Sequence, residues 1–127
     1  MDEELTGEYH VFMSEIHELA ERIKDFRNAR DWKQFHRPKD LALSLVLEAT
    51  EVLELFQWKS ETEALEVVDK KKEDLADELA DVFYWVLLMG EDFGIDIKDA
   101  LIKKLEKNEA KYPVEKAKGT SKKYTEL

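Results

Sequence analysis

"LADELADVFYW", residues 75–85, has the spacing of an amphipathic helix and places three acids, Asp77, Glu78 and Asp81, directly before the most apolar run of the chain, residues 82–90. A helix that is about to be buried should carry few charges, because an unpaired charge is costly to remove from water. The stretch therefore predicts a buried helix whose acids have a compensating partner.

The composition of the chain favours one compact, helical domain. Its 127 residues are 43% hydrophobic and include only four Gly and two Pro, which predicts a single domain over residues 1–127. The absence of Cys from the sequence excludes disulfides, thiolate metal sites and Cys nucleophiles.

Apolar periodicity and end signals divide the rest of the chain into helices. Pro38 suits a helix start, Gly94 a helix end, and Pro113 ends the last helix. Residues 59–69 read as a polar connector with at most a helical turn, and residues 114–127 as a polar, basic tail. Four helices with short links predict an all-α four-helix bundle; the expected spans are 8–30, 38–58, 70–93 and 96–112.

The second and third expected helices share the pattern L-x-x-E-x-x-[E/D]-V. With a shift of thirty residues, Glu48 and Glu51 fall on Glu78 and Asp81. Because each residue turns a helix by about 100°, acids three apart lie about 60° from each other, at the border of the apolar stripe. The pattern therefore aims four carboxylates at the space between two helices, where burial costs on the order of several kcal/mol per ion unless protons or cations compensate.

A hard divalent cation is the natural compensation for these carboxylates. With no His or Cys among them, the cluster favours Mg²⁺ or Mn²⁺ over zinc. Di-iron bundles place a His three residues after a Glu, where this chain has Glu51 and Asp81, which argues against iron. Acids three apart are also common on solvated helix surfaces, but a repeated frame beside large apolar residues favours a cation site. His10 and His17 show no partners that suggest a second site.

The inward stripe of the last helix carries polar side chains as well as apolar ones; they are Lys104, Asn108 and Tyr112. A Lys can neutralise a phosphate, an Asn can pair with a base or sugar edge, and a Tyr can stack. The alternative is structural, with Lys104 extending to solvent along its stem and Tyr112 packing as a core aromatic.

The segment "RDWKQFHRPKD", residues 30–40, combines aromatic and basic residues. Trp32, Phe35 and His36 stand beside Arg37 and Lys39, a combination suited to stacking a base and holding its phosphates. The alternative is that the aromatic residues simply cover the core.

The charge balance and the termini limit the partners that we expect. Thirty acids against twenty bases give a net charge of −10, which disfavours binding to a nucleic acid polymer. The longest uncharged run, residues 82–90, is about half a membrane span, and "MDEEL" has neither the basic nor the apolar region of a signal peptide. We therefore expect a soluble, cytoplasmic protein with no membrane partner.

Over nearly the whole chain, the sequence resembles the MazG-like all-α nucleotide pyrophosphohydrolases, and most closely the dCTP pyrophosphatase branch. The resemblance is carried by the E-x-x-E and E-x-x-D pairs within "LALSLVLEATEVLELFQWK" and "DELADVFYWVLL", and by "RDWKQFH", "KKLEKNEAKYP" and "SKKYTEL". It implies a hydrolase that cleaves a nucleoside triphosphate such as dCTP, or a related or modified nucleotide, to the monophosphate and pyrophosphate.

The resemblance also implies roles for individual residues. Glu48, Glu51, Glu78 and Asp81 would be the Mg²⁺ ligands. For the implied hydrolysis, a carboxylate of this cluster not fully occupied by metal, Glu48 or Glu51, is the simplest candidate base for the attacking water. Lys104 would contact phosphate and Asn108 the nucleotide. The positions that would line the base and sugar pocket are Trp32, His36, Trp58 and Tyr112, together with Trp85, where relatives usually carry Tyr.

The apolar run at residues 82–90 also predicts self-association. It is apolar on nearly every side of its helix, more than one four-helix protomer can cover. A closed homo-oligomer is the usual solution, so we expect a dimer or a tetramer built from two dimers. Two other functions fit the same residues: a helical oligomerisation module whose acids are surface charges, and a nucleotide-binding bundle without turnover.

Overall fold

The computed structural model describes the backbone of residues 2–127 and the side chains of residues 15–127. The part of the first expected helix before residue 15, which includes His10, lies outside the described side chains. All regular elements of the described residues are helical, as predicted. In chain order they are α1 (Asp2–Ala29), the 3₁₀-helix η1 (Lys33–Phe35), α2 (Pro38–Glu54), α3 (Glu61–Lys70), α4 (Lys72–Phe93), α5 (Ile97–Lys111), α6 (Val114–Ala117) and the 3₁₀-helix η2 (Tyr124–Glu126).

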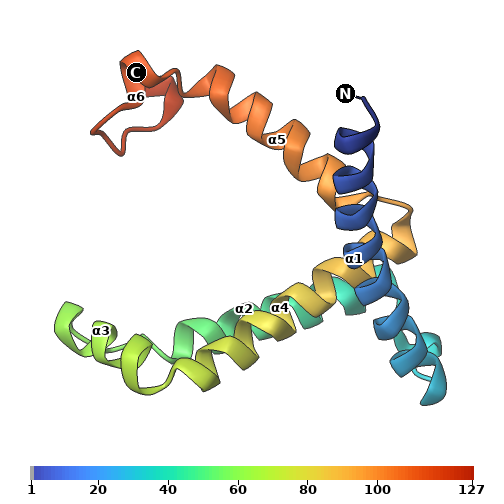
Figure 1. Cartoon of the computed structure of the whole chain (residues 1–127). Coiled ribbons are helices and arrows are strands. Elements are labelled where there is room, and N and C mark those ends of the chain that lie inside the picture. Colours follow the sequence, from blue (N-terminus) through green and yellow to red (C-terminus); the bar gives the residue numbers. More distant parts are fainter. Residues whose placement is uncertain (1) are drawn as a thin grey trace. The chain divides into compact units, whose positions relative to one another are not determined.

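The chain forms two compact units, residues 1–94 and residues 95–127. In the first unit α2 and α4 pack side by side, and α1 and α3 each pack on α4 (Figure 1). The α2–α4 pair is the centre of this unit because its apolar stripes face each other, with Leu41 of α2 and Leu87 and Leu88 of α4 almost completely buried.

Two ion pairs join α1 to the last turns of α4. Lys24 Nζ lies 3.3 Å from Glu91 Oε1. The guanidinium of Arg27 donates to both carboxylate oxygens of Asp92, at 2.6 and 2.8 Å. These pairs fix the place where α1 meets α4, close to the start of the segment that leads to α2.

The connector expected at residues 59–69 is wrong, because α3 occupies residues 61–70. Ser60 and Glu63 form a capping box: the Ser60 hydroxyl accepts from the Glu63 N–H, and the Glu63 carboxylate accepts from the Ser60 N–H. Val67 is buried in this unit. The cap satisfies the first N–H groups of the helix, and this Val supplies its apolar anchor.

The second expected helix ends one turn earlier than predicted. Its regular hydrogen bonding stops at Glu54, and the N–H groups of Phe56 and Gln57 both donate to the carbonyl of Leu53. The chain then turns sharply, and Trp58 has a left-handed backbone with φ 66°. The first and third helices begin at residues 2 and 72 instead of 8 and 70.

The second unit contains α5, α6 and η2. Its first helix begins as predicted, with the Asp96 carboxylate accepting from the Asp99 N–H at 3.0 Å. Gly94, left-handed with φ 66°, ends α4 as expected. The tail expected after Pro113 contains two short helical turns, and Tyr124 in the second packs edge-on against Tyr112, with 6.0 Å between ring centroids.

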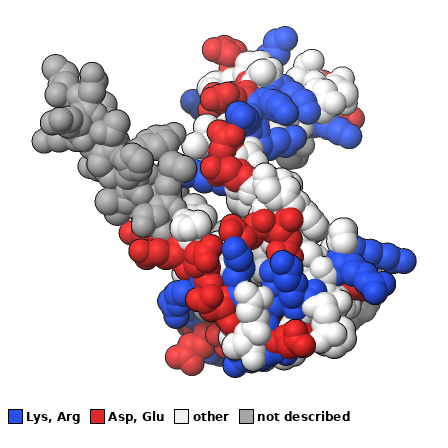
Figure 2. All heavy atoms as spheres, turned by 90° about the vertical axis from the view of Figure 1, so that its right-hand side faces the viewer, with Lys and Arg blue, Asp and Glu red and all other residues white. Residues whose placement is uncertain are grey.

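On the face drawn in Figure 2, acidic and basic side chains both occur beside apolar and neutral ones. Within the described part of the chain, none of the helices combines the length and the low charge that a bilayer span requires.

Candidate metal centre

Four carboxylates from two helices converge between α2 and α4. Glu48 and Glu51 come from α2, and Glu78 and Asp81 from α4; one oxygen of each lies within 4.8 Å of the others. The convergence follows from the repeated pattern, because acids three residues apart share a helix border and the two helices pack side by side. The juxtaposition predicted from the sequence is therefore present.

The carboxylates are short of partners. Oε2 of Glu48 and Oε2 of Glu78 are buried and accept no hydrogen bond from the described residues. A hydrogen bond shared with Glu51 is the main cause that raises the pKa of Glu78 to about 7, followed by burial and the charges of Glu51, Asp81 and Glu48. Burial, followed by the Glu51 contact, also raises the pKa of Glu48. The cluster thus holds more negative charge than the surrounding residues compensate.

This donor set fits a metal ion. All four ligand groups are carboxylates, which hard divalent cations prefer. The two orphaned oxygens would find in a cation the partner that the described residues do not provide. The acid cluster could therefore hold a metal ion, and its uncompensated charge is a physical reason for it to do so.

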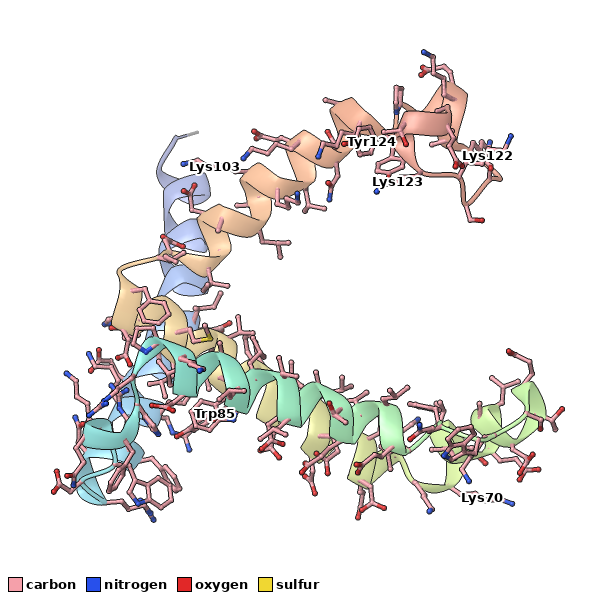
Figure 3. The ribbon with its side chains drawn as sticks, turned by 180° about the vertical axis from the view of Figure 1, so that it is seen from behind. Lys70, Trp85, Lys103, Lys122, Lys123 and Tyr124 are labelled. Carbon is pink, nitrogen blue, oxygen red and sulfur yellow. The ribbon has the colours of Figure 1, made fainter. Side chains whose placement is uncertain are left out.

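Trp85 connects the acid cluster to the aromatic residues of the segment after α1. Its indole lies close enough to Glu48 to oppose the rise in the pKa of that carboxyl, and its ring meets His36 edge to face with centroids 5.3 Å apart. Figure 3 shows Trp85 on α4 beside the turn that leads from α1 to α2. Burial, and secondarily the charge of Arg27, lowers the pKa of His36, so its imidazole is neutral at neutral pH.

The other two tryptophans predicted for the site are placed differently. Trp32 packs edge-on against Phe26, with centroids 5.7 Å apart, and keeps 42% of its surface exposed. Trp58, in the turn after α2, is 92% exposed. The first unit therefore brings Trp85 and His36 together with the acids, places Trp32 in the neighbouring aromatic cluster, and leaves Trp58 in solvent.

The remaining predicted residues lie on the second unit. Lys104 is exposed and Asn108 is half-buried on α5. Tyr112 follows the end of α5 and contacts Tyr124, whose ring also lies under Lys111 Nζ at 4.9 Å from the centroid. Within this unit the end of α5 and the tail thus form one aromatic and basic surface.

A second group of potential ligands was not expected from the sequence. His17, Glu21 and Glu91 place one ligand atom each within 4.8 Å of one another. Lys24 Nζ lies 3.3 Å from a carboxylate oxygen of both acids, so the positive charge at this group comes from the chain itself. The spacing of His17 and Glu21 was a usable signal, whereas Glu91 arrives from another helix.

Comparisons with known proteins agree on one family. Residues 43–127 match the model of the MazG-like family. The chain is 40% identical over 105 residues to dCTP pyrophosphatase 1 of Mus musculus and 37% identical over 105 residues to that of Homo sapiens; each match covers 81% of this chain. The chain spans only 62% of the length of these curated relatives.

A solved structure is similar to the chain as well. It is a pyrophosphatase from Archaeoglobus fulgidus DSM 4304, which superposes with a TM-score of 0.74 at 39% sequence identity. The match covers 78% of this chain and 93% of that one. Both comparisons therefore find proteins named pyrophosphatases.

Proposed function

Because the chain belongs to the MazG-like family, we propose that it is a Mg²⁺-dependent nucleotide pyrophosphohydrolase that converts dCTP, or a related or modified nucleoside triphosphate, to the monophosphate and pyrophosphate. The substrate class is supported by the similarity to relatives named dCTP pyrophosphatase 1. In this proposal the protein clears selected nucleotides from the cellular pool.

The observation that carries the proposal is the four-carboxylate cluster with its two orphaned oxygens. Oxygens of Glu48, Glu51, Glu78 and Asp81 lie within 4.8 Å of one another, and one oxygen each of Glu48 and Glu78 is buried without a partner. An acidic protein needs a cation to hold an anionic triphosphate, and this cluster is suited to Mg²⁺, with Mn²⁺ as a substitute.

The chain's own residues divide the remaining work. When bound, Mg²⁺ supplies charge neutralisation for the phosphate oxygens and for the leaving pyrophosphate. Glu48 or Glu51 accepts the proton of the attacking water, because a carboxylate in reach of the water is the simplest base available. The Trp85 indole, which opposes the rise in the pKa of Glu48, orients that carboxylate.

The nucleotide side of the proposed site combines aromatic and polar groups. His36 and Trp85 provide ring surfaces near the metal ligands, and Trp32 and Trp58 extend the stacking surface. From the second unit, Lys104 pairs with phosphate, Asn108 contacts the nucleotide, and Tyr112 lines the sugar or base pocket. We further propose that the two units form one MazG-like domain over residues 1–127 with a tail at 114–127, since the family match at residues 43–127 includes parts of both.

The products of triphosphate hydrolysis test the proposal directly. With Mg²⁺ and a panel of common and 5-modified triphosphates, we expect pyrophosphate and the monophosphate in equal amounts, fastest with dCTP or a modified cytosine nucleotide. Anion chromatography separates pyrophosphate from orthophosphate. Orthophosphate with a nucleoside diphosphate would mean that the bond between the β and γ phosphates is cleaved, which contradicts the proposal. No turnover would leave only a nucleotide-binding function.

We also propose that the chain assembles as a bundle of helices from two or four copies. Besides the apolar run of α4, α2 carries apolar side chains that are 51% to 62% exposed; they are Leu43, Val46, Leu47 and Leu53. Their spacings of three, four and ten residues place them on one helix face. A second copy suits this face, because identical apolar stripes are complementary in a two-fold dimer.

Light scattering at micromolar concentration should therefore give the mass of a dimer or tetramer for the parent protein. Leu47→Lys should lower that mass, because it places a charge in the apolar interface. Leu65→Lys on α3 is a matched control, since Leu65 is also exposed, at 71%, but lies on a different helix. A monomeric parent would contradict the assembly.

A further inference from the structure

The ion pair between Arg27 and Asp92 lies in a buried position, where charged side chains are rare. Arg27 is 1% exposed and is the only charged residue among the described side chains that is fully buried. Its two terminal nitrogens donate to the two oxygens of Asp92, while its Nε is buried with no described partner. Replacing a buried ion pair by apolar residues of similar volume is often neutral or stabilising, so stability alone gives little reason for the pair. Two hydrogen bonds from one guanidinium to one carboxylate do fix the orientation of the Arg side chain.

The backbone that leaves Arg27 is tied to it. The carbonyl of Arg27 accepts from the N–H of Arg30 at 3.2 Å and from the N–H of Trp32 at 3.1 Å. The carbonyl of Trp32 in turn accepts from Phe35 at 3.0 Å. Residues 27–36 therefore form one hydrogen-bonded segment, and Arg27 is the end at which an ion pair joins it to α4.

This anchored segment carries two residues of the proposed nucleotide site. Trp32 packs on Phe26, whose ring also meets Tyr84 of α4 with centroids 6.4 Å apart. His36, at the far end of the segment, meets Trp85 of α4. A change in the direction of Arg27 would be passed to both rings, because they share the same short segment.

The anchor is separate from the acid cluster. Asp92 follows Asp81 by eleven residues on α4, which is about 16 Å along a helix. A substitution at Asp92 can therefore change the aromatic side of the site and leave the four carboxylates as they are.

We infer that Arg27 and Asp92 are positioning residues for nucleotide binding: their ion pair holds residues 27–36 so that Trp32 and His36 stand beside α4 where the nucleotide binds. This role rests on the proposed function. It is distinct from metal binding, since neither residue belongs to the acid cluster, and from catalysis, since neither touches the reacting atoms.

Asp92→Asn and Arg27→Lys test the inference. The second variant keeps the positive charge but cannot make the two parallel hydrogen bonds that the guanidinium makes to Asp92. Each should raise the KM for the nucleotide about tenfold, equivalent to about 1.4 kcal/mol, with kcat changed less than threefold and with the Mg²⁺-induced rise in Tm preserved. Asp92→Glu keeps the carboxylate and should recover part of the loss. Lys24→Gln is the matched control, because it breaks the other ion pair between α1 and α4 without touching residues 27–36.

A second measurement needs neither nucleotide nor turnover. In a Trp58→Phe background, which removes the 92% exposed tryptophan, acrylamide quenching reports on Trp32 and Trp85. Quenching should increase about twofold in Asp92→Asn and in Arg27→Lys, because a released segment exposes its rings, and it should stay at the parent value in Lys24→Gln.

The inference is overturned if the pair variants change KM no more than Lys24→Gln does while Tm falls, which is the result of a purely structural ion pair. Unchanged quenching would overturn it as well. An inactive parent would instead refute the proposed function, and this would be seen before any variant is made. The quenching comparison would then still decide whether the pair holds the segment.

Discussion

Glu78→Gln should reduce Mg²⁺-dependent release of pyrophosphate from dCTP by at least about 100-fold. Substituting residues that only hydrogen-bond to metal ligands already lowers metal affinity or activity about 10- to 100-fold. Gln is nearly isosteric with Glu, so packing between α2 and α4 should survive. The lost charge weakens a site made of four carboxylates. Glu48→Gln should behave in the same way. The measurement is the rate of pyrophosphate release at saturating Mg²⁺.

The stability of the Glu78→Gln variant should move in the opposite direction from its activity. Removing one of several crowded acids relieves repulsion, so Tm without metal should stay level or rise. The rise in Tm on adding Mg²⁺ should shrink, because less cation binds the folded state. Asp77→Asn removes the same charge from an exposed position one residue away and is the control. Parent activity in Glu78→Gln would place the site elsewhere.

The metal-free protein should lose stability as the pH rises from about 5 to about 8. The pKa of Glu78 is about 7 in the folded protein, raised first by the hydrogen bond shared with Glu51, whereas its ordinary value is near 4.5. Between these values the folded state holds the proton and the unfolded chain does not. The stabilisation is therefore complete below the ordinary pKa and is lost as the pH rises through 7.

Mg²⁺ should reverse this dependence, because the cation replaces the proton. The apparent dissociation constant for Mg²⁺ should fall by up to about tenfold per pH unit between pH 5 and 7, as expected when binding releases one proton. Calorimetric titrations in buffers of different ionisation enthalpy count the released protons directly. Glu78→Gln should flatten both trends, and a parent protein with pH-independent Mg²⁺ binding would contradict the shared proton.

The repeated acidic pattern made the convergence of the four acids predictable from the sequence. Glu48, Glu51, Glu78 and Asp81 follow a helical repeat, and helical repeats report which residues share a face. Local signals likewise located the end of α4 at Gly94 and the start of α5 at Asp96, since both residues act on neighbouring backbone groups. These features depend on residues a few positions apart, which is the range that a single sequence reveals.

What the sequence did not reveal depends on residues far apart or on a missed cap. The capping box of Ser60 and Glu63 is a local signal for the start of α3, whereas the polar composition of residues 59–69 alone predicts a connector. The Arg27–Asp92 pair joins residues 65 positions apart. Nothing local distinguishes Arg27 from the exposed Arg30 three residues later; only the packing of α1 on α4 makes one buried and leaves the other in solvent.

The turn after α2 places a large aromatic ring where a glycine would be more comfortable. At φ 66°, the Cβ of Trp58 crowds its own backbone, which costs an L-residue roughly 1–2 kcal/mol. Its indole, 92% exposed, recovers little of this cost by burial in the single chain. Selection for the folding of this turn alone would favour Gly over Trp at this position. Trp58 therefore lowers the stability of the free chain, and strained residues of this kind occur where the side chain serves binding to a ligand or a partner.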